Sequence, residues 1–469
     1  MAEQFDAVVV GSGPNGLAAA ITLGEAGKSV LVLEAAGIPG GGLRTQELLE
    51  PGFRHDVCST IMALPPLLPF FAPLRLELVT PPAPIAHPFD DGTVVIVERS
   101  VEHTASRLRG DAADYRRLMH PLAARAPELL SMVLGPPRPP RHPLLLARYG
   151  VPGLLSALAL AGVFFREREA RALLAGAAAH SLLALDEAGT GAIGLLMLAS
   201  AHAGGWPVAR GGSASVAKAM LRRLTELGGS VRANHRVASV DELPPHRAVL
   251  LDLAPKGMLE LAGSRFPQRY RNDLAAFRYG PGAFKLDWTL DAPIPWKSAE
   301  CLRAATVHLG GTMDEIAESE LQVAHGGHPS RPFVLLTQPT LFDRARAPDD
   351  RHVAWAYCHV PNGSDVDMTR AIEDQVERFA PGFRDVVRKR SAWTARRIES
   401  EEPNCVGGDF MGGRMDLRGL LARPVLSLNP YATPDPEIFI CSASTPPGGG
   451  IHGMCGVNAA RAALKSRLR

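Results

Sequence analysis

The sequence predicts a doubly wound α/β domain that is assembled from distant parts of the chain, with an α+β domain inserted between those parts. Two observations lead to this fold class. The chain opens with a strand, a glycine-rich turn and a helix, and further apolar runs typical of buried strands recur at 248–255 and 437–444. Strands that are buried on both faces of a parallel sheet read as such continuous apolar runs. The segments between them mix helices and strands, as expected of an inserted domain.

The opening unit of strand, helix and strand carries the clearest motif. Residues 5–10 and 29–35 are short Val- and Leu-rich runs, and residues 15–27 show helical spacing between them. The turn reads GSGPNG and matches G-x-G-x-x-G. In this strand-turn-helix context the match indicates a Rossmann-like dinucleotide site, although a glycine-rich structural turn is the alternative.

A physical requirement explains why each of these residue types stands at its position in the turn. Gly11 permits the tight turn, Gly13 lets a pyrophosphate approach the backbone, and Gly16 lets the helix pack closely on the strand. Pro14 and Asn15 open the helix, whose N-terminus offers free N–H groups and a partial positive charge to the phosphates. We therefore expect these five residues to bind the cofactor.

Two further features indicate which dinucleotide the site would bind. Glu34 closes the second strand, where a carboxylate can accept both hydroxyls of an adenosine ribose and would repel a 2′-phosphate. A second glycine cluster follows, with Gly41, Gly42, Leu43 and Arg44. A flavin dinucleotide needs backbone close to its long second half, and Arg44 could contact the pyrophosphate or the flavin edge. A plain surface loop is the alternative.

Composition excludes several classes of function. The chain has 469 residues, 46% of them hydrophobic, and a net charge of +2 with no block of like charge. This balance disfavours nucleic-acid binding. The six cysteines are scattered without metal-ligand spacing, so we expect no metal site and a reducing compartment. The N-terminus enters a strand at once and leaves no room for a signal peptide. A cytoplasmic location follows, and the Ala- and Arg-rich composition hints at a bacterial source.

We expect five segments along the chain. The nucleotide-binding domain takes 1–106, 204–266 and 425–469, and the substrate domain takes 107–203, which is mostly helical, and 267–424. An apolar stretch at 150–165 is shorter than the roughly 20 residues of a spanning helix. We expect a buried or surface-dipping helix there. The Leu- and Ala-rich region 144–198 forms a helical core, or it lines an apolar tunnel and touches a bilayer as a peripheral contact.

Several motifs together resemble the phytoene desaturase and carotenoid isomerase-like flavoproteins of the amine-oxidase-type FAD superfamily. They are VVVGSGPNGLAAA, LVLEA, GGLRT, PGFRHDVCS, ARGGSASVAKAM, HRVASV, TVHLGG and CSASTPPGGGIHGMCG. The resemblance covers most of the chain and is weakest between 107 and 203. It implies non-covalent FAD on a fold of the amine-oxidase or glutathione-reductase type.

The resemblance also assigns site residues. It implies that Gly449, Gly450, Ile451 and Met454 line the flavin, and that the backbone of Val237 pairs with adenine. The final helix would then point its N-terminus at the pyrimidine end of the flavin. This agrees with physical expectation, because a reduced flavin carries negative charge that a helix N-terminus stabilises.

The expected chemistry is hydride transfer between a substrate C–H bond and flavin N5. His452 is a candidate general base, although a structural or flavin contact is the alternative. Lys285 resembles lysines that hold a water near N5 in the superfamily. His308 and Asp56 are better explained as a satisfied core histidine and a helix-capping aspartate. Cys455 is better explained as a buried small residue than as a covalent flavin attachment.

These features predict an FAD-dependent dehydrogenase or desaturase for an apolar substrate, with an isoprenoid or polyene as the family-level expectation. The electron acceptor (O₂ or a quinone) and the oligomeric state stay open. A flavin amine oxidase using O₂ is one alternative, for which we expect an aromatic cage that the sequence does not display as a clear Tyr/Trp pair. A non-catalytic prenyl carrier or chaperone on the same fold is another, which the intact glycine motifs disfavour.

Overall fold

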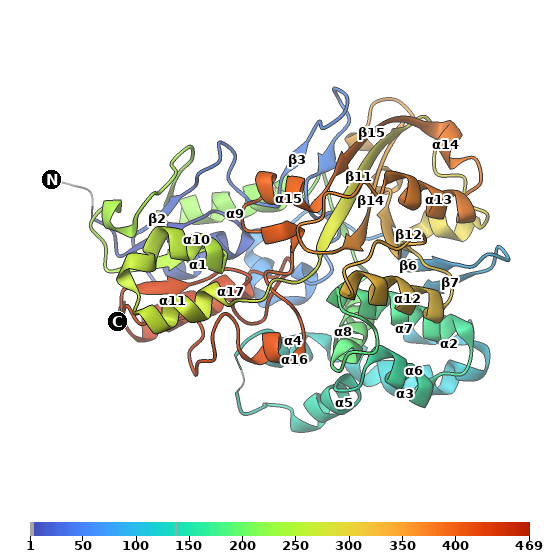
Figure 1. Cartoon of the computed structure of the whole chain (residues 1–469), viewed down its shortest axis with the longest axis horizontal. Coiled ribbons are helices and arrows are strands. Elements are labelled where there is room, and N and C mark those ends of the chain that lie inside the picture. The colour runs from blue at the N-terminus through green and yellow to red at the C-terminus, as the bar shows by residue number, and fades with distance from the viewer. Residues whose placement is uncertain (1–3, 137) are drawn as a thin grey trace.

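The computed structural model describes residues 4–136 and 138–469, and its chain folds around two separate β-sheets (Figure 1). The first sheet is parallel, with five strands in the order β16-β10-β1-β2-β9. Its strands are β1 (Ala7–Val10), β2 (Val30–Leu33), β9 (Ser230–Arg232), β10 (Ala248–Leu251) and β16 (Ile438–Ile440). The start, the middle and the last part of the chain therefore share one sheet, and the expected α/β fold class is confirmed.

Helices cover both faces of this sheet. Alternate strand residues such as Val9 and Val32 pack against α1 (Pro14–Glu25), α9 (Ala214–Glu226) and α17 (Met454–Lys465). The residues between them pack against α10 (Pro255–Ala262) and α11 (Gln268–Ala275). Burial on both faces explains why these strands are continuous apolar runs.

Helix α17 lies directly against α1, and two glycines permit this close approach. A Cβ atom on Gly456 would fall 1.9 Å from the backbone oxygen of Asn15, and one on Gly453 would fall 2.9 Å from the Cβ of Ala18. The N-termini of the first and last helices of the domain therefore lie close together.

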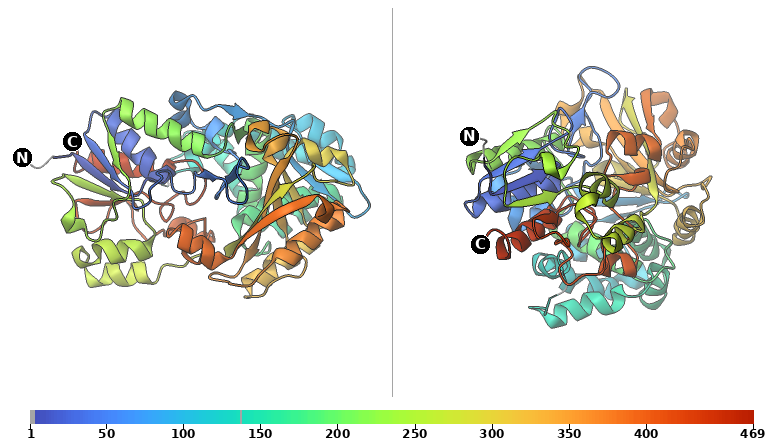
Figure 2. Two further views of the ribbon diagram at one scale, coloured as in Figure 1. Left: turned by 90° about the horizontal axis from the view of Figure 1, so that it is seen from above. Right: turned by 60° about the vertical axis from the view of Figure 1, so that its left-hand side comes forward.

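The second sheet has seven strands in the order β15-β11-β14-β13-β12-β6-β7, all antiparallel neighbours except the parallel pair β12 and β6. The two sheets lie at opposite ends of the molecule (Figure 2). The strands are β6 (Ala83–Pro88), β7 (Val94–Val97), β11 (Gly282–Leu290), β12 (Ala304–Leu309), β13 (Val334–Thr337), β14 (His352–Val360) and β15 (Val387–Trp393).

The two faces of the second sheet differ in chemistry. Phe284, Leu286 and Trp288 of β11 face an apolar core with α13 (Thr369–Phe379). The intervening residues of the same strand, Lys285 and Asp287, are polar and buried on the opposite face. This opposite face is turned toward the helical part of the chain and toward the nucleotide-binding sheet.

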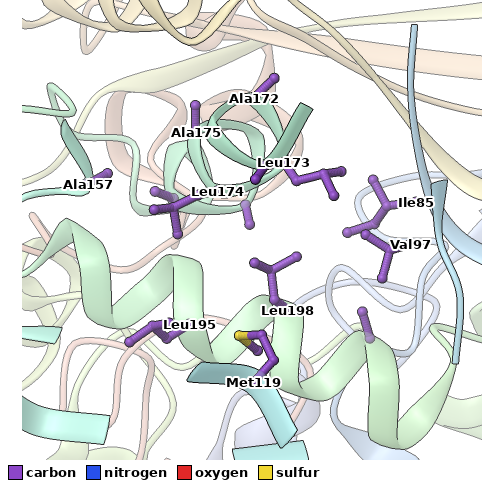
Figure 3. Close-up of a cluster of buried hydrophobic side chains, with 14 of the residues drawn as sticks. Ile85, Val97, Met119, Ala157, Ala172, Leu173, Leu174, Ala175, Leu195 and Leu198 are labelled. Carbon is purple, nitrogen blue, oxygen red and sulfur yellow. The ribbon is translucent and has the colours of Figure 1, made fainter. Parts of the chain in front are cut away.

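The helical part packs against the edge of the second sheet near β6 and β7. Figure 3 shows side chains of α7 and α8, among them Leu174, Leu195 and Leu198, in one cluster with Ile85 and Val97. Its helices are α2 (Val101–Ser106), α3 (Ala112–Ala123), α4 (Ala126–Val133), α5 (Pro143–Gly153), α6 (Ala157–Phe164), α7 (Arg168–Ala178) and α8 (Thr190–Gly204). The remaining elements are β3 (Thr45–Gln46), β4 (His55–Asp56), β5 (Leu78–Val79), β8 (Val208–Ala209), α12 (Met313–Ala324), α14 (Phe383–Val386), α15 (Ala395–Glu401) and α16 (Leu417–Leu421).

The structure corrects the expectations in three places. Strands β6 and β7, expected within the first segment of the nucleotide-binding domain, join the seven-stranded sheet instead. The stretch 150–165 is not one helix, because α5 and α6 are bent by 105° at the break between them. The run SVRANHRVASV at 230–240 is typical of two paired short strands, but the structure has only the short strand β9 there. The other domain boundaries stay predictions.

A search of the described residues for membrane-spanning helices found no single helix that is long and apolar enough to cross a bilayer. The bent pair of α5 and α6 passes the test of length and composition only when its two helices are taken together.

Candidate functional site

One cavity of about 740 Å³ lies where the two sheets and the helical part meet. Gly13, Pro14 and Asn15 of the opening loop line it, and so do residues of the closing loop. The lining residues of the closing loop are Gly449, Gly450, Ile451 and His452. The structure therefore brings together the two glycine loops that are furthest apart in the sequence.

The opening loop packs on a carboxylate that the sequence reasoning missed. Asp252 follows β10, and its Oδ2 accepts a hydrogen bond of 2.8 Å from the backbone N–H of Gly16. A Cβ atom on Gly13 would fall 2.7 Å from the same oxygen, and one on Gly11 would fall 2.9 Å from the Asp252 carbonyl oxygen. Burial raises the pKa of the Asp252 carboxyl to about 7. The position of Asp252 directly after a buried strand could have indicated from the sequence that it lies at the site.

Glu34 is held in place by the opening loop. Its carboxylate accepts hydrogen bonds from the backbone N–H (2.8 Å) and hydroxyl (2.6 Å) of Ser12, and from the N–H of Ala36 (2.8 Å). The N–H of His235 donates to the Glu34 carbonyl oxygen, so the segment that contains Val237 follows the end of β2. Neither Glu34 nor Val237 lines the cavity.

The second glycine cluster lies against the first. A Cβ atom on Gly41 would fall 2.9 Å from the Cα of Gly13, and Gly41, Gly42 and Leu43 line the cavity. Arg44 differs from the expectation, because its guanidinium is paired with Glu402, and Glu402 rather than Arg44 lines the cavity. A contact of Arg44 with the pyrophosphate or the flavin edge stays a prediction.

Both ring nitrogens of His452 are engaged by the closing loop. Nε2 donates to the carbonyl oxygens of Gly448 (3.1 Å) and Gly449 (3.2 Å), while Nδ1 accepts from the backbone N–H of Met454 (3.0 Å). Burial lowers the pKa of His452 to about 4, so the ring is neutral at pH 7. This geometry favours the structural alternative over a general base. The side chain of Met454 is not among those that line the cavity.

Lys285 reaches the cavity from β11. Its ammonium donates to Asp287, which in turn lies 3.3 Å from His55, and all three side chains are buried. The Nζ atom also lies 5.2 Å from the ring centre of Trp355 and 5.7 Å from that of Trp393. Cation–π contacts and the ion pair therefore fix the position of the Lys285 ammonium.

The structure corrects the expectation that no Tyr/Trp pair would emerge. Trp355 and Tyr357 stack on β14 with ring centres 5.8 Å apart and an interplanar angle of 19°, and both line the cavity. Tyr357 is directly opposite Lys285 in the strand pairing. The alternation in HVAWAYCHV places both rings on one face of the strand and could have predicted the pair.

Three residues that the sequence analysis set aside have structural roles. Asp56 is fully buried and accepts from Thr45, Thr60, Ser213 and Arg346. His308 is buried with its Nε2 3.4 Å from that of His180, and burial lowers its pKa. Burial raises the pKa of the Cys455 thiol to about 11. Among the described residues no group of three or more His, Cys, Asp or Glu side chains could hold a metal ion.

The wall of the cavity opposite the second sheet is apolar. It consists of side chains from α4, α5 and α8 and the loop after α4: Met132, Leu134, Leu154, Ile193, Leu196 and Met197. The floor, formed by the second sheet, also carries polar side chains among apolar and aromatic ones; the polar ones are Lys285, Thr306, Thr337 and Tyr357. A molecule in the cavity would lie between an apolar wall and a floor that offers a few polar groups.

Comparisons with known proteins agree with this geometry. Residues 9–74 match a family model described as an NAD(P)-binding Rossmann-like domain. The chain is 25% identical to pyridine nucleotide-disulfide oxidoreductase domain-containing protein 2 of Rattus norvegicus, over 97% of this chain and 93% of that protein. It is 29% identical to a phytoene dehydrogenase of Streptomyces griseus, over 76% of this chain and 73% of that protein.

Solved structures share the fold. A double mutant of putrescine oxidase superimposes with a TM-score of 0.61 at 18% identity, over 99% of both chains. At this identity the likeness concerns the fold alone. Together the family model and the relatives support an oxidoreductase, so the protein is an enzyme.

Proposed function

We propose that the protein is an FAD-dependent dehydrogenase or desaturase that transfers a hydride between an apolar substrate, of the isoprenoid or polyene class, and flavin N5. One observation carries the proposal. A single cavity is lined by both glycine loops and by the apolar side chains of α4, α5 and α8. FAD, when bound, supplies the hydride acceptor at N5.

The residues present fit this cofactor. Helices α1 and α17 begin at Gly13 and Gly453, without a side-chain cap and without an acidic residue in the first turn. Such N-termini favour negative charge, so α1 suits the pyrophosphate and α17 suits the pyrimidine end of a reduced flavin. Asn15 adds a buried Oδ1 without a hydrogen-bond partner in the described structure. Glu34 would hold the adenosine ribose.

The retention of flavin is expected to depend on pH through Asp252. With its pKa raised to about 7, the carboxyl is mostly protonated below pH 7 and charged above it. A charged Asp252 would repel the pyrophosphate beside Gly13. For a repulsion of about 1.4 kcal/mol, the dissociation constant of FAD should therefore rise about fivefold between pH 6 and pH 8.

Asp252 should also make the free energy of unfolding of the cofactor-free protein fall as the pH rises. The folded pKa is raised, so the contribution of protonated Asp252 is present below about pH 4 and is lost as the pH rises to about 7. Titration of flavin fluorescence measures the affinity. In Asp252→Asn the affinity should be flat across this range, whereas Asp273→Asn, a control at an exposed position, should follow the wild type. Equal pH profiles for wild type and Asp252→Asn would contradict the assignment.

Lys285 is the proposed residue that positions a water or a polar substrate atom. One of its three N–H donors is taken by Asp287, which leaves two for the cavity. The adjoining Tyr357 and Thr306 add polar groups on the same floor, while the wall above selects an apolar body. The reacting C–H bond would lie between them, shielded from water.

A flavin amine oxidase is the second candidate, and the stacked pair of Trp355 and Tyr357 favours it. Lys285 does not separate the two candidates, because its resemblance to the lysines near N5 applies to the whole amine-oxidase-type superfamily. The apolar wall of the cavity, with Leu154, Ile193 and Met197, favours an apolar substrate over a cationic amine. The desaturase interpretation is therefore preferred, with O₂ or a quinone as the proposed electron acceptor.

The test is anaerobic mixing of purified, yellow protein with separate substrates while flavin absorbance is followed. A polyene or cyclic monoterpene should bleach the flavin, and putrescine or benzylamine should not. Lys285→Met should slow bleaching about 100-fold, as expected for loss of a positioned proton-transfer group. Lys389→Met on the neighbouring strand β15 is the control, because Lys389 is exposed. Bleaching by the amines alone would overturn the proposal in favour of an amine oxidase.

Flavin content and melting temperature are measured on every variant, because Lys285→Met leaves Asp287 buried without its cation. A slower reaction of a variant is evidence for the role of Lys285 only if that variant retains its flavin. A protein that purifies colourless and cannot be reconstituted with FAD would contradict the cofactor assignment itself.

A further inference from the structure

Three polar side chains form a small group on the surface of the cavity. His180, which follows α7, lines the cavity, and so do Thr306 and Thr337 of the second sheet. The antiparallel register of β12 and β13 places Thr306 and Thr337 side by side. The ring centre of His180 lies 5.4 Å from that of His308, which is two residues from Thr306 and therefore on the same face of β12. The fold thus brings the helical part and two strands together at one polar position.

The hydroxyl of Thr337 lacks a hydrogen-bond partner. The residue is 4% exposed, and within residues 4–136 and 138–469 no group donates to its Oγ1 or accepts from it. Leaving a buried polar group unpaired is unfavourable, so such groups in folded proteins are normally satisfied by the protein, by water or by a ligand. Since Thr337 lines the cavity, a molecule bound there can supply the missing partner.

The two histidines form a pair in which one ring donates to the other, because their Nε2 atoms lie 3.4 Å apart. Burial lowers the pKa of His180 to about 3 and that of His308 well below its usual range, so each neutral ring carries one proton at pH 7. Nδ1 of His308 is buried without a partner among the described residues, where an N–H group would be costly. We therefore assign the His308 proton to Nε2, which donates to His180. The half-buried His180 then keeps its own proton on Nδ1 and can donate it to a ligand.

The charged side chains of the cavity lie elsewhere. Within the described part of the chain, those that line the cavity are Asp252, Lys285 and Glu402. Asp252 packs on the opening loop, and Glu402 pairs with Arg44 of the second glycine cluster. Lys285 is two strands away from Thr337 in the order β11-β14-β13, which is about 10 Å at the usual spacing of strands. A buried charge needs a partner of opposite charge, so this position suits an uncharged ligand group.

The surroundings of the three polar side chains are apolar. Trp206 lies edge-on to His180 with ring centres 5.6 Å apart, and Leu335 stands opposite His308 in the strand pairing. Both Trp206 and Leu335 line the cavity. A ligand that fits here would be mostly apolar and would carry a single polar group.

We propose that His180, Thr306 and Thr337 form a subsite for one uncharged oxygen, a hydroxyl or a carbonyl, at one end of an otherwise apolar substrate. Nδ1 of His180 would donate to this oxygen, and the hydroxyl of Thr337 would gain its missing partner. His308 is a positioning residue, because it holds His180 in the required tautomer. That the ligand is the substrate rests on the proposed function. Its reacting C–H bond beside Lys285 would then lie about 10 Å from the oxygen, which therefore stays unoxidised.

Three isoprenoids with the same fifteen-carbon skeleton test the subsite: the alcohol farnesol, the hydrocarbon farnesene and the carboxylate of farnesoic acid. The flavin-loaded full chain is first reduced with dithionite, so that no hydride can leave the ligand. The Kd is then read without oxygen from tryptophan fluorescence, to which Trp206, Trp355 and Trp393 of the cavity contribute. Farnesol should bind at least about tenfold more tightly than farnesene, as expected for paired hydrogen bonds in a buried site. The carboxylate should bind more weakly than farnesol, because its charge would be buried without a partner.

Two variants remove hydrogen-bonding groups and keep the shape of the cavity. Thr337→Val and, separately, His180→Phe should each weaken farnesol binding about tenfold and leave farnesene binding unchanged. Thr225→Val, at an exposed threonine on α9, is the matched control and should bind both ligands like the wild type. Leu196→Ala in the apolar wall should weaken both ligands alike.

Several results would overturn the proposal. They are equal affinity of the wild type for farnesol and farnesene, tighter binding of the carboxylate than of farnesol, and unchanged farnesol binding by both Thr337→Val and His180→Phe. A loss in both variants that is the same for farnesol and farnesene would also overturn it, because it would indicate a change of shape and not of hydrogen bonding.

Flavin absorbance of the oxidised protein keeps the two proposals apart. Loaded protein that prefers farnesol to farnesene but is bleached by no isoprenoid would contradict the proposed function alone. Loaded protein that farnesene and farnesol bleach equally fast at limiting concentration would contradict the subsite alone. Oxidation of farnesol to its aldehyde would place the hydroxyl at the flavin and would likewise contradict the subsite.

Discussion

A Gly456→Ala variant is expected to lose at least about 3 kcal/mol of unfolding free energy, the upper part of the usual cost of overpacking. The added Cβ would fall 1.9 Å from the Asn15 carbonyl oxygen and 2.8 Å from the Ala19 nitrogen. Both neighbours are backbone atoms of α1, so no side-chain rotation relieves the overlap. Helix α17 would have to move away from α1, and flavin retention should fall with it. Urea unfolding followed by circular dichroism measures the loss.

Gly162→Ala is the matched control. Gly162 also lies inside a helix, α6, but a Cβ there meets no atom within 4 Å. Alanine has a higher helix propensity than glycine by about 1 kcal/mol, so this variant should be as stable as the wild type or more stable. If both variants unfold at the same urea concentration as the wild type, the close contact between α1 and α17 is wrong.

Gly13→Val is expected to abolish flavin retention. A Cβ at this position would lie 2.7 Å from Asp252 Oδ2, and a valine adds two methyl groups on the surface of the cavity. The displaced carboxylate would lose its hydrogen bond from Gly16, and the methyl groups would block the approach of a pyrophosphate to the backbone. The ratio of flavin absorbance near 450 nm to protein absorbance measures the flavin that the purified variant retains.

The control for this variant is Gly257→Val in α10, where the nearest atom to a Cβ is 3.7 Å away. It should purify with the flavin content of the wild type. A Gly13→Val protein that purifies fully loaded would show that the phosphates lie elsewhere, and that the opening turn is only structural.

Local patterns in the sequence predicted the elements well. The opening unit and the strands β10 and β16 follow the expected segments, because each has its own local pattern. The convergence of the Gly13 and Gly449 loops was predicted from the resemblance of motifs and from the need of a flavin for both. The helices and strands depend on residues that are close in sequence, whereas the convergence of these two distant loops had no local signal.

Features that depend on pairing between distant segments were not predicted. Lys285 and Tyr357 are neighbours only through the register of β11 and β14. Arg44 pairs with Glu402, which lies more than three hundred residues later in the chain, so no local pattern could have predicted this contact. The engagement of both nitrogens of His452 likewise depends on the folded loop. Strand register and loop conformation are tertiary properties, which periodicity alone does not determine.

The interleaving of β1, β10 and β16 in one sheet has a consequence for biosynthesis. On the ribosome, the first strand and α1 emerge long before β16 and α17, on which their buried faces depend. A nascent chain therefore exposes the apolar side of α1 through most of translation, a state that invites aggregation and chaperone binding. Binding of the proposed flavin is therefore expected to be a late event, after the segment that contains α17 has left the exit tunnel.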